Sequence, residues 1–404
     1  MTLLSFHAAR LYNVGLYSVR QYYFVNNTYL NYSKNYHECK GNENYKLLLS
    51  DTAQQILRLV ERNMKSFFAL WGLKQAGKYS EKVRLPHYKG KQELGIIPIQ
   101  GRSARIKDNK VYIGLSKTFK EQYAPSFKEF VFTLPKHIQV DTLQEVRIIP
   151  VFGGKEFDIE YVYKKTVEPH QDLTSNRYLG IDMGLDNFAT CLNSATGFSF
   201  IIDGKTIKSI NQRYNKETAR LQGIKDHQHH AHTTNRMFRL ARKRKFQINN
   251  YMNLAVKYIT DYCIAHKIGT IVVGDFSGIK QNINHGKRNN QNFVQIPYGV
   301  FRQKLKSKSQ QLGIVCDSHE ESYTSKTSFL DREFPEKHDT YKGRRVRRGL
   351  FRASNGTTIN ADVNSAAQIL HKYLKSNRLL TDSFFELAAK GCVDHPRRVR
   401  LINS

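Results

Sequence analysis

The order of strands and helices in the second half of the chain is the feature that most restricts its fold. From about residue 176, three short apolar strands precede a long helical stretch, and strands and helices then alternate. This order predicts a mixed α/β, ribonuclease H-like fold. The expected strands are 178–182, 187–192, 198–202, 270–273 and 314–316, and the expected helices are 206–266, 298–312 and one that starts near Asp362.

The first 175 residues separate into two parts by the period of their apolar residues. Residues 1–78 have a helical period. Residues 79–175 alternate with a period of two between turn signals, which predicts a small OB-like β-barrel or a sandwich. The tyrosines of 11–24 are interpreted as packing residues, with stacking on bases as the alternative. One helical stripe is expected to be buried and consists of Ile56, Val60, Met64, Phe67 and Trp71.

The chain is strongly basic. Lys and Arg total 64 against 34 acidic residues, a formal net charge of +30. Such a surplus causes self-repulsion unless a polyanion compensates it, so nucleic acid is the expected partner, ahead of an anionic membrane. Two clusters contain more Lys and Arg residues than solvation of the surface alone explains. The residues expected to contact nucleic acid are Arg239, Arg242, Lys243, Arg244, Lys245, Arg344, Arg345, Arg347 and Arg348.

The cysteines indicate a reducing compartment. They are odd in number, widely spaced and never arranged as C-x-x-C, which favours reduced thiols in a cytoplasm. The short apolar run at the N-terminus follows no basic region, and no run of about 18 apolar residues occurs, so we expect a soluble protein without membrane contact. The five cysteines are Cys39, Cys191, Cys263, Cys316 and Cys392.

Two acidic residues stand where a metal-dependent nuclease needs them. Asp182 ends a buried strand, and Gly184 follows it closely enough to let a backbone or phosphate approach. Asp362 lies at the start of a helix, whose N-terminus favours the ionised carboxylate. Cleavage of a phosphodiester by two Mg²⁺ ions requires such carboxylates. The structural alternatives are a turn aspartate and a helix cap.

A third acid is less obvious from the pattern. Asp275 follows the apolar strand 270–273, whereas Glu320 and Glu321 follow the strand 314–316. The pattern alone leaves the choice between them open.

These motifs resemble the TnpB family, transposon-encoded relatives and ancestors of type V CRISPR nucleases. The resemblance covers the whole chain and rests on the segments 11–13 with 20–21, 180–184, 289–293, 320–326, 341–346 and 360–364. It implies a helical recognition domain at 1–78, a β-barrel wedge domain at 79–175 and a RuvC-like nuclease domain at 176–404. The nuclease domain would contain an insertion that binds target nucleic acid at about 322–358.

The resemblance also implies roles for single residues. The family's RuvC-like domain cuts DNA with Asp, Glu and Asp, and the first and last carry over to Asp182 and Asp362. Many members have the glutamate directly after the middle strand, where this chain has Asp275. A branch of the family has that acid in an E-S-Y-T-S segment instead, which implies Glu321 as the third ligand of two Mg²⁺ ions, with Glu320 and Asp275 as alternatives.

Zinc is a second departure from the family pattern. Many members have paired C-x-x-C motifs before the last aspartate, but 322–358 contains no cysteine, so we expect no structural zinc. Four apolar side chains are expected to pack there instead, namely Phe329, Leu330, Leu350 and Phe351. A separate histidine cluster could bind metal, but a polar surface or a phosphate contact is favoured; it consists of His227, His229, His230 and His232.

The function that the resemblance implies is RNA-guided cleavage of DNA. A guide RNA would pair with one DNA strand, and the protein would read a short flanking motif itself. We expect a monomer in a prokaryotic cytoplasm. The alternatives are a nuclease-inactive RNA-guided repressor that binds DNA, and a guide-independent nuclease or transposase.

Overall fold

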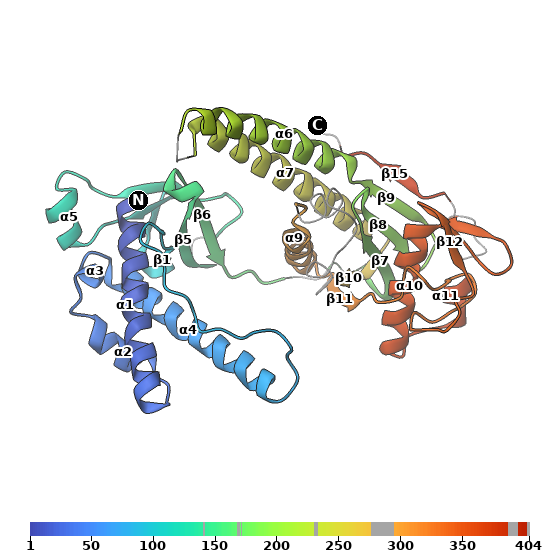
Figure 1. Ribbon diagram of the computed structural model, residues 1–404, viewed down its shortest axis with the longest axis horizontal. Coiled ribbons are helices and arrows are strands. Elements are labelled where there is room, and N and C mark those ends of the chain that lie inside the picture. Colours follow the sequence, from blue (N-terminus) through green and yellow to red (C-terminus); the bar gives the residue numbers. More distant parts are fainter. Residues whose placement is uncertain are drawn as a thin grey trace. The chain divides into compact units, whose positions relative to one another are not determined.

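The computed structural model describes residues 1–139, 142–167, 170, 172–229, 233–275, 295–386 and 395–401 (Figure 1). The chain forms two compact units, Met1–Lys165 and Thr166–Ser404. Both units contain helices and sheets, so the predicted multidomain, mixed α/β class is confirmed. None of the helices in these ranges is both long and apolar enough to cross a membrane.

In the first unit, helices and strands share one hydrophobic core. Helix α1 packs on α4, and buried residues of both helices join buried strand residues in a single cluster. The strands form two antiparallel sheets, with the orders β1-β5-β6 and β2-β3-β4. The elements are α1 Thr2–Asn26, α2 Tyr32–Cys39, α3 Glu43–Lys46, α4 Ser50–Gln75, β1 Ile97–Gln100, β2 Arg105–Lys107, β3 Lys110–Ile113, α5 Lys117–Tyr123, β4 Phe130–Thr133, β5 Leu143–Val151 and β6 Glu156–Tyr163.

The stripe predicted on α4 is buried only in part. Ile56, Val60 and Met64 are at most 2% exposed, and Phe67 is half-buried. Trp71 is 42% exposed, so its predicted burial is wrong. The reason is that the last turns of α4, from residue 69 onward, are largely exposed and lie beyond the core.

The second unit is built on a six-stranded sheet with the order β11-β10-β7-β8-β9-β15. Strands β7, β8 and β9 are antiparallel neighbours, β10 pairs parallel to β7, and β11 pairs parallel to β10. The helical stretch predicted at 206–266 is two helices. The elements are β7 Thr174–Met183, β8 Asn187–Asn193, β9 Ser199–Asp203, α6 Lys205–His227, α7 Asn235–Ala265, β10 Ile268–Asp275, α9 Tyr298–Gln311, β11 Val315–Glu320, β12 Arg344–Arg347, β13 Leu350–Arg352, β14 Thr358–Asn360, α10 Ala361–Ser376, α11 Asp382–Phe385 and β15 Arg397–Val399.

Helices cover both faces of this sheet (Figure 1). Leu179, Ile181 and Met183 of β7 belong to a core with α7 and α9, and the alternate residue Tyr178 belongs to a core with α10. Gly180 lies under α10, where an added Cβ would be 2.6 Å from Leu370 Cγ. Because only glycine allows this approach, α10 packs directly on the strand that leads to Asp182.

The segment between β11 and α10 is held by apolar packing and a buried polar network. Phe329 and Phe351 are each 1% exposed and join the core of α10. The buried carboxylate of Glu333 accepts hydrogen bonds from the backbone of Ser328 at 2.9 Å and of Lys342 at 3.0 Å. Each acceptor oxygen of this carboxylate thus has a donor, which a buried charge requires.

The approach of α10 to β7 predicts a stability effect. We expect Gly180→Ala to lower the thermal midpoint of the second unit, at a cost of about 1–3 kcal/mol, because α10 must move away from the strand. Gly223→Ala is the matched control, since Gly223 is exposed on α6 with nothing within 4 Å of its added Cβ. Thermal denaturation followed by circular dichroism measures both, and an unchanged midpoint for Gly180→Ala would contradict this packing.

Candidate active site

The ends of three strands bring the predicted acids to one edge of the sheet. Strands β7, β10 and β11 run parallel, and Ile181 of β7 pairs with Val273 of β10. Asp275 at the end of β10 in turn pairs with Glu320 at the end of β11. Because parallel strands end at the same edge, Asp182 and the three candidates for the third acid all lie there.

The alternation of side chains separates the three candidates. Gly274 faces α10, since its added Cβ would lie 2.8 Å from Ile369 Cδ1. The same added atom would lie 2.3 Å from Glu321 Oε2, so the carboxylate of Glu321 lies over Gly274. Asp182 shares this face, because it is two residues beyond Gly180 on β7. Glu321 therefore approaches Asp182 across a strand position that has no side chain.

The two other candidates have basic partners. Asp275 forms an ion pair with Arg302 of α9. Glu320 forms an ion pair with Lys372 of α10 and accepts a hydrogen bond of 2.6 Å from the backbone of Ser322. Among the described residues, by contrast, Glu321 Oε2 is buried and has no hydrogen-bond partner. Glu321 is thus the candidate with an unused carboxylate oxygen next to Asp182.

Asp362 reaches the same edge from the first turn of α10. The side chain of Asn360 caps this helix by accepting hydrogen bonds from the backbone of Asp362 at 3.0 Å and of Val363 at 3.2 Å. Asp362 Oδ2 accepts a hydrogen bond of 2.6 Å from Asn187 Nδ2 of β8. Its other oxygen lies 3.5 Å from Arg345 Nη2 of β12. Contacts from two strands therefore orient this carboxylate.

The electrostatics link Asp182 to the other two acids. Burial, and then the neighbouring charges of Asp362 and Glu321, raise the pKa of Asp182 well above its usual value, while Arg345 lowers it. Burial and the charges of other acids also raise the pKa of Glu321 to about 7. Such shifts are typical of carboxylates clustered for a function.

The donor set fits a hard divalent cation. All three groups supply carboxylate oxygens, the ligands that Mg²⁺ prefers, and Glu321 Oε2 is a buried acceptor without a donor. In the part of the chain that the structure describes, no three Asp, Glu, His or Cys side chains come together as a ready-made metal site. Mg²⁺ usually keeps several waters and takes only one or two carboxylates, so the acids need not all ligate one ion.

Comparison with known proteins agrees with this architecture. Residues 160–280 match a family described as probable transposase, OrfB_IS605, and residues 298–369 match the Cas12f1-like TNB domain family. A chain in the cryo-EM structure of a Cas12f1-sgRNA-target DNA complex is 17% identical, with a TM-score of 0.59 over 91% of this chain and 81% of that chain. These two partial family matches are consistent with the resemblance to TnpB that the sequence motifs predict.

Two further comparisons gave one weaker match and no match, respectively. A chain in the cryo-EM structure of a CRISPR-Cas12f ternary complex is 15% identical, with a TM-score of 0.37 over 91% of this chain and 80% of that chain. No curated protein matches. At 17% identity, the likeness to the Cas12f1 chain establishes a shared fold.

Several residues of this candidate site were not predicted from the sequence. Asn187 donates to Asp362, and its Oδ1 accepts a hydrogen bond of 3.2 Å from Arg398 Nη1. Tyr298 donates a hydrogen bond of 2.8 Å to the carbonyl of Gly184, just after Asp182. Asn187 is a polar residue at the start of the strand antiparallel to β7, and this position could have indicated it in the sequence. Nothing in the local sequence indicates Tyr298.

The predicted basic residues differ in their surroundings. Arg345 of β12 contacts Asp362, and Arg348, which follows β12, forms an ion pair with Asp186. Arg244 is half-buried and donates hydrogen bonds to Asn211 Oδ1 at 2.8 Å and to the carbonyl of Gln295 at 3.1 Å. Burial lowers the pKa of Arg244. The remaining predicted residues are exposed, namely Arg239, Arg242, Lys243, Lys245, Arg344 and Arg347.

The histidine cluster is described only in part, and one family segment is not described. His227 ends α6, and His229 follows it at the surface. His230, His232 and the segment 289–293 lie outside the described residues.

The opposite environments of two neighbouring glutamates predict a pH effect in metal-free protein. The pKa of Glu321 rises from 4.5 to about 7, so the stability that its protonated form contributes is present below pH 4.5 and lost as the pH rises to 7. Glu321→Gln should therefore raise the thermal midpoint at pH 8, by the equivalent of about 1–3 kcal/mol, and leave it unchanged at pH 4.

Glu320→Gln is the matched control for this measurement. Burial alone would raise the pKa of Glu320, but the hydrogen bonds from Lys372 and Ser322 hold it below its usual value. Replacing Glu320 should give no gain at pH 8. Equal shifts for Glu321→Gln at both pH values, measured by thermal denaturation in EDTA, would show that Glu321 is not a strained carboxylate.

Proposed function

We propose that this chain is an RNA-guided DNA endonuclease that hydrolyses DNA next to a short flanking motif. The observation that supports it most is the convergence of Asp182, Glu321 and Asp362 at the end of the parallel strands. A buried carboxylate without a hydrogen-bond donor destabilises a fold, so its presence beside two other acids needs a functional reason. Coordination of divalent cations is that reason.

In this proposal the carboxylates of Asp182, Glu321 and Asp362 hold two Mg²⁺ ions. When bound, the ions would activate the attacking water and stabilise the leaving oxygen. Asn187 keeps Asp362 turned towards the sheet edge through its hydrogen bond. Arg345 and Arg348 place guanidinium groups at the same edge, where they can bind the phosphates that flank the scissile bond.

The proposed ligands are a guide RNA and a target DNA. The net charge of +30 requires a polyanion, and exposed arginines on α7 and β12 can contact phosphates without reading the sequence. The structural relative with the shared fold was solved in complex with sgRNA and target DNA, which supports the same partners here. We further propose that the chain acts as a monomer in a prokaryotic cytoplasm.

Two alternative functions explain fewer of these observations. A repressor that only occupies DNA has no need for three mutually repelling carboxylates, two of them with raised pKa. A guide-independent nuclease or transposase would not select one RNA. Sequencing the nucleic acid that copurifies with the chain separates the cases, since a discrete structured RNA supports guided action and random fragments oppose it.

Replacement of the acids tests the proposed chemistry. We expect Asp182→Ala, Glu321→Ala and Asp362→Ala each to reduce DNA cleavage by about a thousandfold or more, since each removes several kcal/mol of metal-assisted stabilisation. Glu320→Ala and Asp275→Asn are the controls at the same sheet edge, and they should retain most of the activity. Cleavage of a labelled duplex by the chain with its copurified RNA measures all five.

Retention of RNA must be measured for every variant in the same preparation. Cleavage that survives Asp182→Ala or Asp362→Ala would refute the assignment of the site. Loss of cleavage in Asp275→Asn with normal activity in Glu321→Ala would instead assign the third carboxylate to Asp275.

A further inference from the structure

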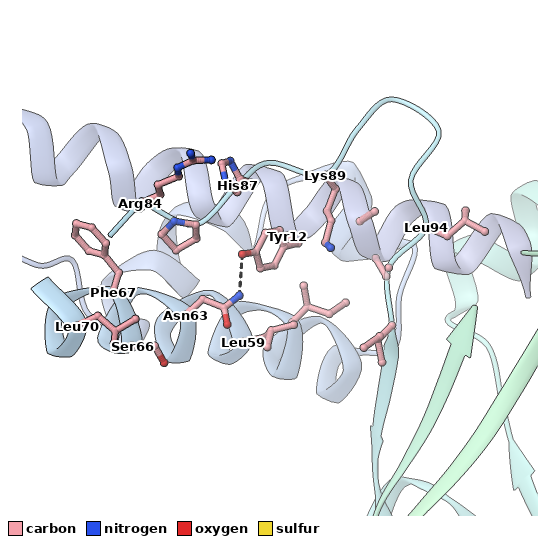
Figure 2. A pocket seen from close by; sticks show the side chains of 16 residues that line it. Tyr12, Leu59, Asn63, Ser66, Phe67, Leu70, Arg84, His87, Lys89 and Leu94 are labelled. Carbon is pink, nitrogen blue, oxygen red and sulfur yellow. Dashed lines mark hydrogen bonds between the residues drawn. The ribbon is translucent and has the colours of Figure 1, made fainter. Parts of the chain in front are cut away.

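We propose that a cavity in the first unit binds a single unpaired nucleotide of the nucleic acid that the chain carries. The cavity lies between α1, α4 and the extended segment 84–96 and has a volume of about 450 Å³ (Figure 2). Sites for small ligands typically measure about 300–1,000 Å³. This inference rests on the proposed function, because it assumes that nucleic acid is the natural ligand.

The walls of the cavity suit the flat, apolar face of a base. Tyr12 of α1 and Phe67 of α4 supply aromatic rings, and Leu59, Leu70 and Ile96 supply aliphatic surface. Room for a ligand exists because α1 presents the small residues Ala8 and Ala9 to the cavity. Stacking on aromatic rings tolerates every base, so these walls suit a nucleobase of any kind.

Polar groups lie where the edge of a base would need them. Asn63 Nδ2 donates a hydrogen bond of 2.9 Å to the hydroxyl of Tyr12, as Figure 2 shows. That hydroxyl keeps its own proton for donation, and the Oδ1 of Asn63 accepts no hydrogen bond from any described residue. Ser66 lines the cavity one turn further along α4. The Ser66 hydroxyl donates its proton to the carbonyl of Arg62 at 2.9 Å, so it can only accept from a ligand. With the Asn63 carboxamide and the Tyr12 hydroxyl, the cavity thus offers both acceptors and a donor to a base edge.

The charge of the cavity suits a phosphate. Its lining, as far as the structure describes it, contains no acidic residue but includes Arg84, His87 and Lys89. Lys89 forms an ion pair of 2.7 Å with Glu93, whereas Arg84 is exposed and has no ion-pair partner in the described ranges. Figure 2 shows Arg84 on the segment opposite the α4 side chains Phe67 and Leu70. Arg84 is therefore the side chain available for a phosphate.

The cavity is held open by contacts with the backbone of the segment 84–96. Asn13 of α1 donates to the carbonyl of Lys89 at 2.9 Å and accepts from its amide at 2.7 Å. Further along, the amide of Gly95 donates a hydrogen bond of 2.8 Å to the carbonyl of Ser5, and an added Cβ on Gly95 would lie 2.7 Å from the amide nitrogen of Ala9. The site is thus largely preformed, which lowers the cost of ordering a ligand.

An unpaired nucleotide satisfies all of these features, whereas a paired one does not. A base in a duplex has both faces covered by its neighbours and its edge used by its partner, so it cannot enter a cavity between two helices. The nucleotide can come from a bulge or loop of RNA, or from a displaced DNA strand. The 2′-hydroxyl distinguishes these two sources.

Hairpins with and without one bulged adenosine test the proposal in EDTA, where no cleavage occurs. For the wild-type chain we expect the bulge to increase affinity about tenfold, the scale of one stacked base. Ser66→Phe fills the cavity from an exposed position, and Arg84→Ala removes its free charge; both should abolish this gain and leave binding of the perfect hairpin intact. Arg62→Ala, an exposed charge on α4 outside the cavity, is the matched control and should keep the gain.

Trp71 provides a local signal for the same site. It is the single tryptophan of the chain and stacks on Phe67 with ring centroids 6.2 Å apart. Millimolar AMP should quench its fluorescence in a saturable way, whereas ribose 5-phosphate, which lacks a base, should not. Preference for AMP over dAMP, and for the bulged RNA over the bulged DNA, identifies RNA as the source of the nucleotide. Equal responses show that the cavity accepts a nucleotide from RNA or from DNA.

The outcomes separate this inference from the proposed function. Equal affinity for bulged and perfect hairpins, or a gain that survives Ser66→Phe, overturns the nucleotide site while general nucleic-acid binding stands. Failure to bind any hairpin overturns both. Quenching by ribose 5-phosphate as strong as by AMP reduces the cavity to an anion site and also overturns the proposal.

Discussion

The repulsion among carboxylates gathered at one end of the central sheet is the constraint on which the second unit depends. Asp182, Glu321 and Asp362 come from β7, from the residue after β11 and from α10, so no local segment holds them together. Their proximity is imposed by packing, above all by the contact of α10 with Gly180 and by the empty position at Gly274. A glycine at each of these points lets a helix or a carboxylate approach where a side chain would block it.

The basic side chains around this edge divide the acids into two groups. Asp275 and Glu320 have their own basic partners in Arg302 and Lys372. Burial, and after it the charges of neighbouring acids, raise the pKa values of Asp182 and Glu321. These ion pairs distinguish Asp275 and Glu320 from Glu321, whose buried Oε2 has no hydrogen-bond partner among the described residues.

The sequence indicates residues whose role follows from a local pattern. Asp182 ends a buried strand and Asp362 begins an amphipathic helix, and both positions can be identified from a few neighbours. The choice among Asp275, Glu320 and Glu321 depends on where β11 ends and which face each side chain takes. Because strand alternation reverses with every residue, a strand predicted to end at 316 but observed to end at 320 leaves that choice undetermined.

Features made by distant segments could not be predicted. The hydrogen bond from Asn187 to Asp362 joins residues 175 positions apart, and the cavity of the first unit needs α1, α4 and the segment 84–96 together. The exposed Trp71 shows the same limit, because the apolar stripe of α4 continues past the point where the core ends. Periodicity identifies the face of a helix but not how far its neighbours extend.

The most direct test of the account is to locate a bound cation by the cuts that it makes in the chain. Fe²⁺ in place of Mg²⁺, with ascorbate and peroxide, generates hydroxyl radicals that break the backbone near the ion, and mass spectrometry identifies the breaks. The account predicts breaks near residues 182, 321 and 362 in the same sample, suppressed by excess Mg²⁺ and absent in Asp182→Asn. Breaks at only one of these places, or breaks that Asp182→Asn leaves unchanged, would contradict a shared metal centre.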